Sequence, residues 1–158
     1  MNLKIGQGID FHRLEKGLNL FLGGIKIPSE KGCVAHSDGD VLLHAICDAL
    51  LGAAGLNDIG HHFPDSDSEY KDIDSKILLK RTILLIRGKG YKVVNIDSTV
   101  CLEIPKISPY ISGMKEVISK IAEISSEDIS IKATTTEKLG FTGREEGIAA
   151  IAVALLGK

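Results

Sequence analysis

Three residues with metal-binding side chains stand in two separate apolar segments of the chain. Asp10 and His12 lie two positions apart in residues 5–12. Because side chains at i and i+2 of a β-strand leave the same face, a strand here would aim a carboxylate and an imidazole at one point. His44 lies in a run of apolar residues with helical spacing. One carboxylate and two imidazoles suit catalytic zinc, which takes three protein ligands and keeps a fourth position open.

Each of these residues also has a simpler interpretation. Asp10 could cap a turn, and a lone histidine is more often a hydrogen-bonded polar group than a ligand. The combination of a carboxylate and an imidazole on one strand face with a helical imidazole makes a metal site an equal alternative. Asp40 and Asp48 lie four residues before and after His44, on its helix face. They could orient the ligands or compete with them for the metal.

Two further segments could bind phosphate. His36 and Ser37 precede the predicted helix, whose N-terminal N–H groups and dipole favour an anion. Ser37 and Asp40 also resemble a capping box, so helix capping alone is an alternative. Residues 134–137, Thr-Thr-Thr-Glu, end a strand-like run. Their hydroxyl and N–H groups could hold phosphate oxygens while Glu137 holds Mg²⁺, or the threonines could simply suit a strand.

The patterning of the chain predicts the elements that position these residues. We expect strands over 3–12, 91–102 and 129–133, and a hairpin over 20–28 that turns at Gly23 and Gly24. We expect helices from near Ser37 to Gly52, over 72–88 and over 109–124, with loops over 28–36 and 56–71. The run 148–156 could be a strand or a buried helix. This order predicts one domain over residues 1–158. Its fold class would be α+β, a two-layer α/β sandwich with one mainly four-stranded sheet and helices on one face.

Composition excludes several classes of protein. The net charge is −2 over 158 residues, with no block of like charges, which argues against nucleic-acid binding. No apolar run approaches the ~20 residues of a membrane span, and no signal peptide is apparent, so we expect a cytoplasmic protein or an organelle enzyme after processing. Cys33, Cys47 and Cys101 lack C-x-x-C spacing. They are therefore expected to be buried free thiols.

Taken together, the motifs resemble those of the 2-C-methyl-D-erythritol 2,4-cyclodiphosphate synthase family of the non-mevalonate isoprenoid pathway. The matching stretches are residues 8–12, 35–40 with His44, 58–60, 63–67 and 132–144, in order across almost the whole chain. The resemblance implies a lyase that cyclises 4-diphosphocytidyl-2-C-methyl-D-erythritol 2-phosphate and releases CMP. It also implies a homotrimer with active sites at the subunit interfaces.

The resemblance further implies roles for individual residues. Zinc would be bound by Asp10, His12 and His44, Glu137 would hold Mg²⁺ or Mn²⁺ with the substrate phosphates, and His36 and Thr135 would be the catalytic residues beside the transition state. The implied substrate-binding residues are Asp10, His12, His36, Ser37, Asp58, Ile59, Gly60, Phe63, Pro64, Asp65, Ser66, Asp67, Leu102, Glu103, Ile104, Pro105, Lys106, Ile107, Ser108, Thr134, Thr135, Thr136, Glu137, Phe141 and Arg144. Within this set, Asp58, Gly60 and Asp65 would face the methylerythritol unit, and residues 102–108 would enclose the cytidine.

Three residues depart from the family pattern. Ser66 stands where threonine is expected, Glu103 where an uncharged residue is more usual, and Glu145 where glycine is frequent. Arg144 and Glu146 could form an exposed ion pair or surround an oligomer axis. In the second case they and Phe141 could bind an isoprenoid diphosphate in an axial cavity.

Two other functions share part of this pattern. A zinc hydrolase would use the same three ligands, with bound water as the nucleophile and a general base beside the open position. A trimeric binding module without catalysis would hold a ligand at an apolar axis. A cyclic product distinguishes the synthase from the hydrolase, and metal-dependent turnover distinguishes it from the binding module.

Overall fold

Two long antiparallel strands form the centre of the fold. The computed structural model describes residues 2–158. Strand β1 (Leu3–Lys16) pairs with β7 (Gly147–Gly157) from Leu3 opposite Gly157 to Arg13 opposite Gly147. On its other edge β7 pairs antiparallel with β5 (Lys92–Cys101), and β5 pairs in parallel with β6 (Ile129–Thr134). The run 148–156, which could have been strand or buried helix, is therefore a strand.

The sheet has five strands in the order β4-β1-β7-β5-β6, not the four that we predicted. The additional strand is β4 (Lys31–Val34), which pairs with the end of β1 from Arg13 to Lys16. The segment 28–36 was predicted to be a loop, and residues 31–34 of it are a strand instead. It becomes a strand because β1 runs beyond the predicted end at His12 and offers it an edge. The hairpin of β2 (Leu20–Leu22) and β3 (Ile25–Ile27) forms a separate two-stranded sheet.

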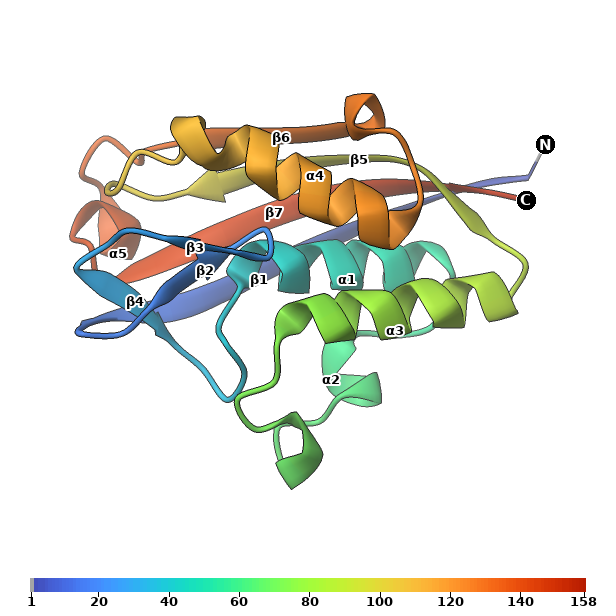
Figure 1. Ribbon diagram of the computed structural model, residues 1–158, viewed down its shortest axis with the longest axis horizontal. Coiled ribbons are helices and arrows are strands. Elements are labelled where there is room, and N and C mark those ends of the chain that lie inside the picture. Colours follow the sequence, from blue (N-terminus) through green and yellow to red (C-terminus); the bar gives the residue numbers. More distant parts are fainter. Residues whose placement is uncertain (1) are drawn as a thin grey trace.

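Three helices lie on one face of the large sheet (Figure 1): α1 (Val41–Ala53), α3 (Ser75–Gly88) and α4 (Ile111–Ala122). Helix α1 is buried on almost every side because it is enclosed by β1, β7 and α3. The short helices α2 (Ile59–His62) and α5 (Gly140–Gly143) lie in the connections. The mixed α/β architecture with helices on one face is as predicted. Within residues 2–158, no helix has the length and apolar character needed to cross a membrane.

Helix α1 packs directly on the backbone of β1. A Cβ atom on Gly8 would lie 2.0 Å from the carbonyl oxygen of Ala45, and one on Gly6 would lie 2.1 Å from that of Ala49. Such distances are far below van der Waals contact, so only glycine permits this approach. The absence of these two side chains brings α1, and His44 on it, against the strand that carries Asp10 and His12.

Helix α1 begins four residues later than the predicted start near Ser37. Its N-cap is Asp40, whose carboxylate accepts a hydrogen bond from Leu43 N at 3.0 Å. The same carboxylate accepts from the amides of Gly23 and Gly24 at 3.0 and 2.7 Å, which ties the β2–β3 turn to the helix. Asp40 is fully buried, and burial raises its pKa to about 6 despite these donors. The predicted capping box of Ser37 and Asp40 is therefore wrong, since Asp40 itself is the cap.

The other face of the sheet exposes large apolar side chains. On β1 they are Ile5, Ile9 and Phe11, which are 72%, 43% and 52% exposed, and on β7 the partner of Ile9 is Ile151, at 38%. They alternate along β1 with the inward-facing Gly6, Gly8, Asp10 and His12. Apolar faces of this kind are typical of surfaces that bind another molecule.

Candidate metal centre and phosphate site

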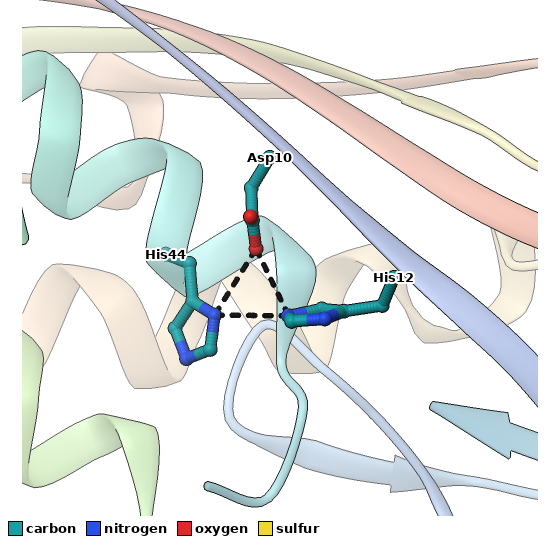
Figure 2. A group of neighbouring side chains, drawn as sticks. All are labelled: Asp10, His12 and His44. Carbon is teal, nitrogen blue, oxygen red and sulfur yellow. Dashed lines mark hydrogen bonds and ion pairs between the residues drawn. The ribbon is translucent and has the colours of Figure 1, made fainter. Parts of the chain in front are cut away.

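Asp10, His12 and His44 converge on one point between β1 and α1 (Figure 2). Asp10 Oδ2 lies 3.0 Å from His12 Nε2 and 3.1 Å from His44 Nδ1, and the two imidazole nitrogens are 3.1 Å apart. A tetrahedral zinc ion with bonds of about 2.0–2.1 Å separates its ligand atoms by about 3.3 Å. The three atoms would have to move apart by only a few tenths of an ångström, so the residues present fit such an ion.

Hydrogen bonding fixes which nitrogen of His44 faces that point. His44 Nε2 lies 2.9 Å from the hydroxyl oxygen of Ser75, and that hydroxyl donates its one proton to Asp38 Oδ1. Ser75 Oγ must therefore accept from His44, which places the imidazole proton on Nε2. The lone pair of Nδ1 is left to face Asp10 and His12, as a metal ligand requires.

The electrostatics of the group also suit a cation. Burial raises the pKa of Asp10, but the contacts with the His12 and His44 side chains lower it more, so that its pKa lies well below the usual range. Burial lowers the pKa of His44, but the contact with Asp10 raises it by a larger amount, so the pKa lies above its usual value. A carboxylate held ionised beside two imidazoles attracts positive charge, which a proton or a divalent ion can supply.

Asp40 and Asp48, considered as partners or rivals of the ligands, have other roles. Asp40 caps α1 as described above. Asp48 accepts a hydrogen bond from Ile59 N at 2.7 Å and so anchors the start of α2. His44 Nε2 is oriented by Ser75, which Asp38 holds, and Ser37 Oγ also lies 3.2 Å from this nitrogen. The sequence did not reveal the contact with Ser75. Ser75 is 31 positions from His44 and begins α3, so only the packing of α3 on α1 could reveal the contact.

A hollow of ≈ 320 Å³ opens beside the three residues. The predicted site residues that line it are Asp10, His12, His36, Ser37, His44, Ile59, Gly60, Phe63 and Asp65. Pro64, Ser66 and Asp67 are not among its lining residues, and Asp58 instead caps α2 by accepting from His61 N at 2.9 Å. The structure thus brings most of the segments 35–40 and 58–65 to the metal group.

A second hollow, of ≈ 200 Å³, lies at the ends of β5 and β6. The predicted nucleotide and phosphate residues that line it are Leu102, Glu103, Pro105, Lys106, Ile107, Ser108, Thr134 and Thr135. Ile104 lines a different hollow, together with Lys31 and Glu145. Thr136 is half-buried, whereas Glu137 is exposed. The two segments predicted to hold the cytidine and the phosphates are therefore neighbours.

The two hollows are far apart within one chain. Across the sheet Phe11 pairs with Ala149, Ala149 with Cys101, and Cys101 with Thr134. Three strand spacings of about 4.8 Å separate Thr134 from Phe11 by about 14 Å. A single chain thus holds the metal group at one place and the threonine segment at another.

The remaining predicted residues lie beside the exposed face of the sheet. Phe141 packs edge-on against Phe11, with ring centroids 5.9 Å apart. Arg144 donates from Nε and Nη2 to the two carboxylate oxygens of Glu146, each at 3.1 Å. Of the two alternatives for Arg144 and Glu146, an ion pair is present in the chain. Their relation to an oligomer axis stays a prediction.

The cysteines are free thiols, as predicted. Cys33 and Cys47 are buried, and burial raises the pKa of each to about 12. Cys101 is only half-buried, at the end of β5. Buried thiols with so high a pKa are unreactive at neutral pH, which agrees with a structural role for the first two.

Comparison with known proteins gives a consistent result. A model of the YgbB family matches residues 3–157. A protein of Bacteroides fragilis named 2-C-methyl-D-erythritol 2,4-cyclodiphosphate synthase is 59% identical over 158 residues, which is 100% of this chain and 99% of the relative.

Solved structures of such proteins have the same fold. A cyclodiphosphate synthase in a form with bound CDP matches with a TM-score of 0.90 and 37% identity, over 98% of this chain and 100% of that one. The bifunctional IspDF from Campylobacter jejuni matches with a TM-score of 0.94 and 41% identity, and there the match covers 98% of this chain but 42% of the larger protein.

Proposed function

The chain belongs to the YgbB family of 2-C-methyl-D-erythritol 2,4-cyclodiphosphate synthases, and on that premise we propose which of its residues perform the reaction. The reaction is the conversion of 4-diphosphocytidyl-2-C-methyl-D-erythritol 2-phosphate to 2-C-methyl-D-erythritol 2,4-cyclodiphosphate with release of CMP, a step of non-mevalonate isoprenoid synthesis. The observation that carries the assignment is the convergence of Asp10, His12 and His44 beside a hollow that also contains His36 and Asp65.

Asp10, His12 and His44 hold a divalent ion, for which their one oxygen and two nitrogen donors favour zinc. When bound, zinc supplies a Lewis acid that polarises the β-phosphate. Glu137 holds Mg²⁺ or Mn²⁺ with the substrate phosphates, since these ions prefer carboxylate and phosphate oxygens. The Ser75–Asp38 pair keeps His44 in the tautomer that presents Nδ1.

The covalent step takes place within the substrate. An oxygen of its 2-phosphate attacks the β-phosphorus, the bond from that phosphorus to the bridging oxygen breaks, and CMP leaves with the electron pair. Because the nucleophile is already an anion, no protein base is needed, and the protein acts by positioning and by offsetting charge. Ser75 is fully buried and donates to Asp38, so the chain Asp38–Ser75–His44 orients a ligand and is no nucleophilic triad.

The substrate contacts are assigned from the family resemblance, and the fact that most of these residues line the two hollows supports the assignment. His36 and Thr135 lie beside the reacting phosphates, with Ser37 and residues 134–136 as phosphate contacts. Asp58, Gly60 and Asp65 bind the methylerythritol unit, supported by residues 59–67. Residues 102–108 enclose the cytidine. A CDP-bound form among the similar structures supports a cytidine nucleotide as the recognised group.

The complete site forms between subunits of a homotrimer. Two observations support this. The backbone at Phe11, between two of the metal ligands, lies about 14 Å from the backbone at Thr134 within one chain. The sheet also exposes an apolar face at Ile5, Ile9, Phe11 and Ile151, which is typical of a binding surface. Residues 1–158 act as one domain, in the cytoplasm or an organelle. Phe141, Arg144 and Glu146 lie near that face, where an axial cavity could take an isoprenoid diphosphate.

The His44→Ala variant tests the assignment. Loss of one of three ligands is expected to abolish stoichiometric zinc binding and to lower CMP release at least about 1,000-fold, as lost Lewis-acid stabilisation of several kcal/mol implies. Zinc is measured by elemental analysis and the organic product by phosphorus NMR, which distinguishes a cyclic from a hydrolysed linear product. The exposed His61 provides the matched control, since His61→Ala should keep its zinc. Normal zinc content and wild-type CMP release in His44→Ala would show the site to be wrongly assigned.

A further inference from the structure

The side chain of Glu103 joins the segment after β5 to the turn after β6. Its Oε1 accepts hydrogen bonds from the backbone amides of Thr136 at 3.1 Å and Lys138 at 3.3 Å. The hydroxyl of Thr136 lies 3.4 Å from the same oxygen. One carboxylate oxygen thus binds two N–H groups of a single turn. The negative charge that was unexpected beside a nucleotide pocket is directed at backbone donors.

The turn that Glu103 binds has an unfavourable backbone conformation. Leu139 N donates to Thr136 O at 3.0 Å, and the two central residues, Glu137 and Lys138, have φ of 52° and 62°. Two consecutive left-handed residues define a type I′ turn, which is normally built from glycine, asparagine or aspartate. A Glu-Lys pair adopts it only when the surroundings hold it there.

Two neighbours hold this turn from different sides. Behind it, a Cβ atom on Gly143 would lie 2.1 Å from the carbonyl carbon of Lys138, so the backbones are in direct contact. On the other side, the Glu103 carboxylate takes the amides of Thr136 and Lys138. The hydroxyl of Thr136 adds bonds to Leu139 O at 2.7 Å and Thr142 Oγ1 at 2.8 Å. Thr136 is thereby anchored, while Thr135 and Glu137 on either side of it are exposed.

We propose that Glu103 is a positioning residue for the cyclisation. By holding the turn at Thr136 and Lys138, it fixes the directions in which Thr135 and Glu137 meet the phosphates and their cation. Glu103 also belongs to the segment 102–108 that encloses the cytidine, so its bonds to the turn keep the nucleotide contacts and the phosphate contacts at a constant separation. This inference rests on the proposed roles of Thr135 and Glu137.

A different role for Glu103 would be direct metal binding, since Mg²⁺ often takes two carboxylates. The two roles depend on different properties of the side chain. Positioning needs an acceptor oxygen, which glutamine keeps, whereas metal binding needs the negative charge, which glutamine lacks. The variants Glu103→Gln and Glu103→Leu therefore separate them. Glu116→Leu is the matched control, because Glu116 is exposed on α4, where its carboxylate pairs with Lys120.

The experiment measures CMP release as a function of substrate and Mg²⁺ concentration. Loss of hydrogen bonds to a charged acceptor is expected to lower kcat of Glu103→Leu about 10- to 100-fold. Its zinc content and oligomeric mass should equal those of the wild type. Glu103→Gln should stay within about threefold of the wild type in kcat and in half-saturating Mg²⁺. Hydrogen exchange adds a readout that needs no substrate: the amides of Thr136 and Lys138 should exchange faster in the leucine variant alone.

Each outcome decides the inference. Wild-type kcat and exchange in Glu103→Leu would overturn it, and so would a glutamine variant as impaired as the leucine variant. If Glu103→Leu does not fold, Glu103→Ala carries the same expectations. A wild-type protein that releases no CMP would refute the proposed function instead. In that case the exchange rates alone decide whether Glu103 holds the turn.

Discussion

The metal half and the nucleotide half of the site are built in opposite ways. Asp10, His12 and His44 project from long, paired elements into a partly enclosed space, and buried side chains orient them from behind. Residues 134–138 instead form an exposed turn with left-handed backbone, held by the side chain of Glu103 and the backbone of Gly143. The first half is complete within a chain. The second presents its functional groups outward.

This difference indicates how the work is divided. A metal ligand set must be held to within a few tenths of an ångström, which close packing between regular elements provides. In the proposed homotrimer, a surface that would receive part of a neighbouring subunit must be accessible before assembly. The three experiments that follow separate the two halves, in order of decreasing expected effect.

Mixing two inactive variants tests whether the halves come from different chains. His44→Ala lacks the metal half and Glu137→Gln the cation-binding carboxylate, so each alone should release CMP very slowly. In trimers formed by co-expression, about a quarter of the interfaces would pair an intact triad with an intact Glu137, as random cyclic assembly requires. CMP release should therefore recover to about a quarter of the wild-type rate. His44→Ala mixed with His12→Ala is the control and should stay inactive. If CMP release did not recover in the mixture of His44→Ala with Glu137→Gln, the whole site would lie in one chain.

The Gly8→Ala variant tests the packing that supports the metal half. Its new methyl group would lie 2.0 Å from Ala45 O, so α1 must move away from β1. We expect unfolding free energy to fall by about 1–3 kcal/mol, as for other overpacked interiors. Zinc should also be lost to a chelator at lower concentration. The free energy of unfolding is measured by denaturant titration, and zinc retention is measured by chelator competition.

Gly52→Ala, on the helix α1 that packs against Gly8, is the matched control. A Cβ atom there would meet only Gln7 O, at 3.9 Å, so the substitution should raise stability by about 1 kcal/mol through helix propensity. Its zinc retention should not change. If Gly8→Ala and Gly52→Ala behaved alike, close approach of α1 to β1 would not be what shapes the metal half.

The smallest effect is expected from Ser75→Ala. Without the hydroxyl, His44 Nε2 loses its shorter hydrogen bond and keeps the contact with Ser37 Oγ at 3.2 Å. Zinc affinity should therefore fall about 10-fold, the lower range for such orienting partners. Ser98→Ala is the control, because Ser98 is also buried and donates to Ser130 O at 3.0 Å, away from the metal group. Both variants should lose similar stability, but only Ser75→Ala should lose zinc affinity. Equal zinc affinity in the two would exclude an orienting role for Ser75.

Local sequence rules predicted the parts of the site that depend on local geometry. The i, i+2 relation placed Asp10 and His12 on one strand face, and helical spacing placed His44 on a helix. Capping could not be resolved in the same way, because Ser37 and Asp40 are both good caps and only the contact of Asp40 with the turn at Gly23 and Gly24 decides between them.

Contacts between distant segments were beyond those rules. Ser75 meets His44 only because α3 packs on α1, and Asp38 acts on His44 through Ser75. Strand β4 has four residues and no alternating pattern, and it exists because β1 extends to Lys16. The Ala-rich run of β7 suited both a strand and a buried helix until the pairing of β1 with β7 was known. In each case tertiary packing supplied information that a window of sequence does not contain.

The direct contact of β1 with α1 at Gly6 and Gly8 has a consequence for ion selectivity. Side chains can rotate to accommodate ions of different radius, but two touching main chains cannot shorten their separation. The backbones that carry Asp10 and His44 are thus already at their closest approach. The spacing of the three ligands can therefore adjust to different ions by side-chain rotation, but not by bringing the helix closer to the strand.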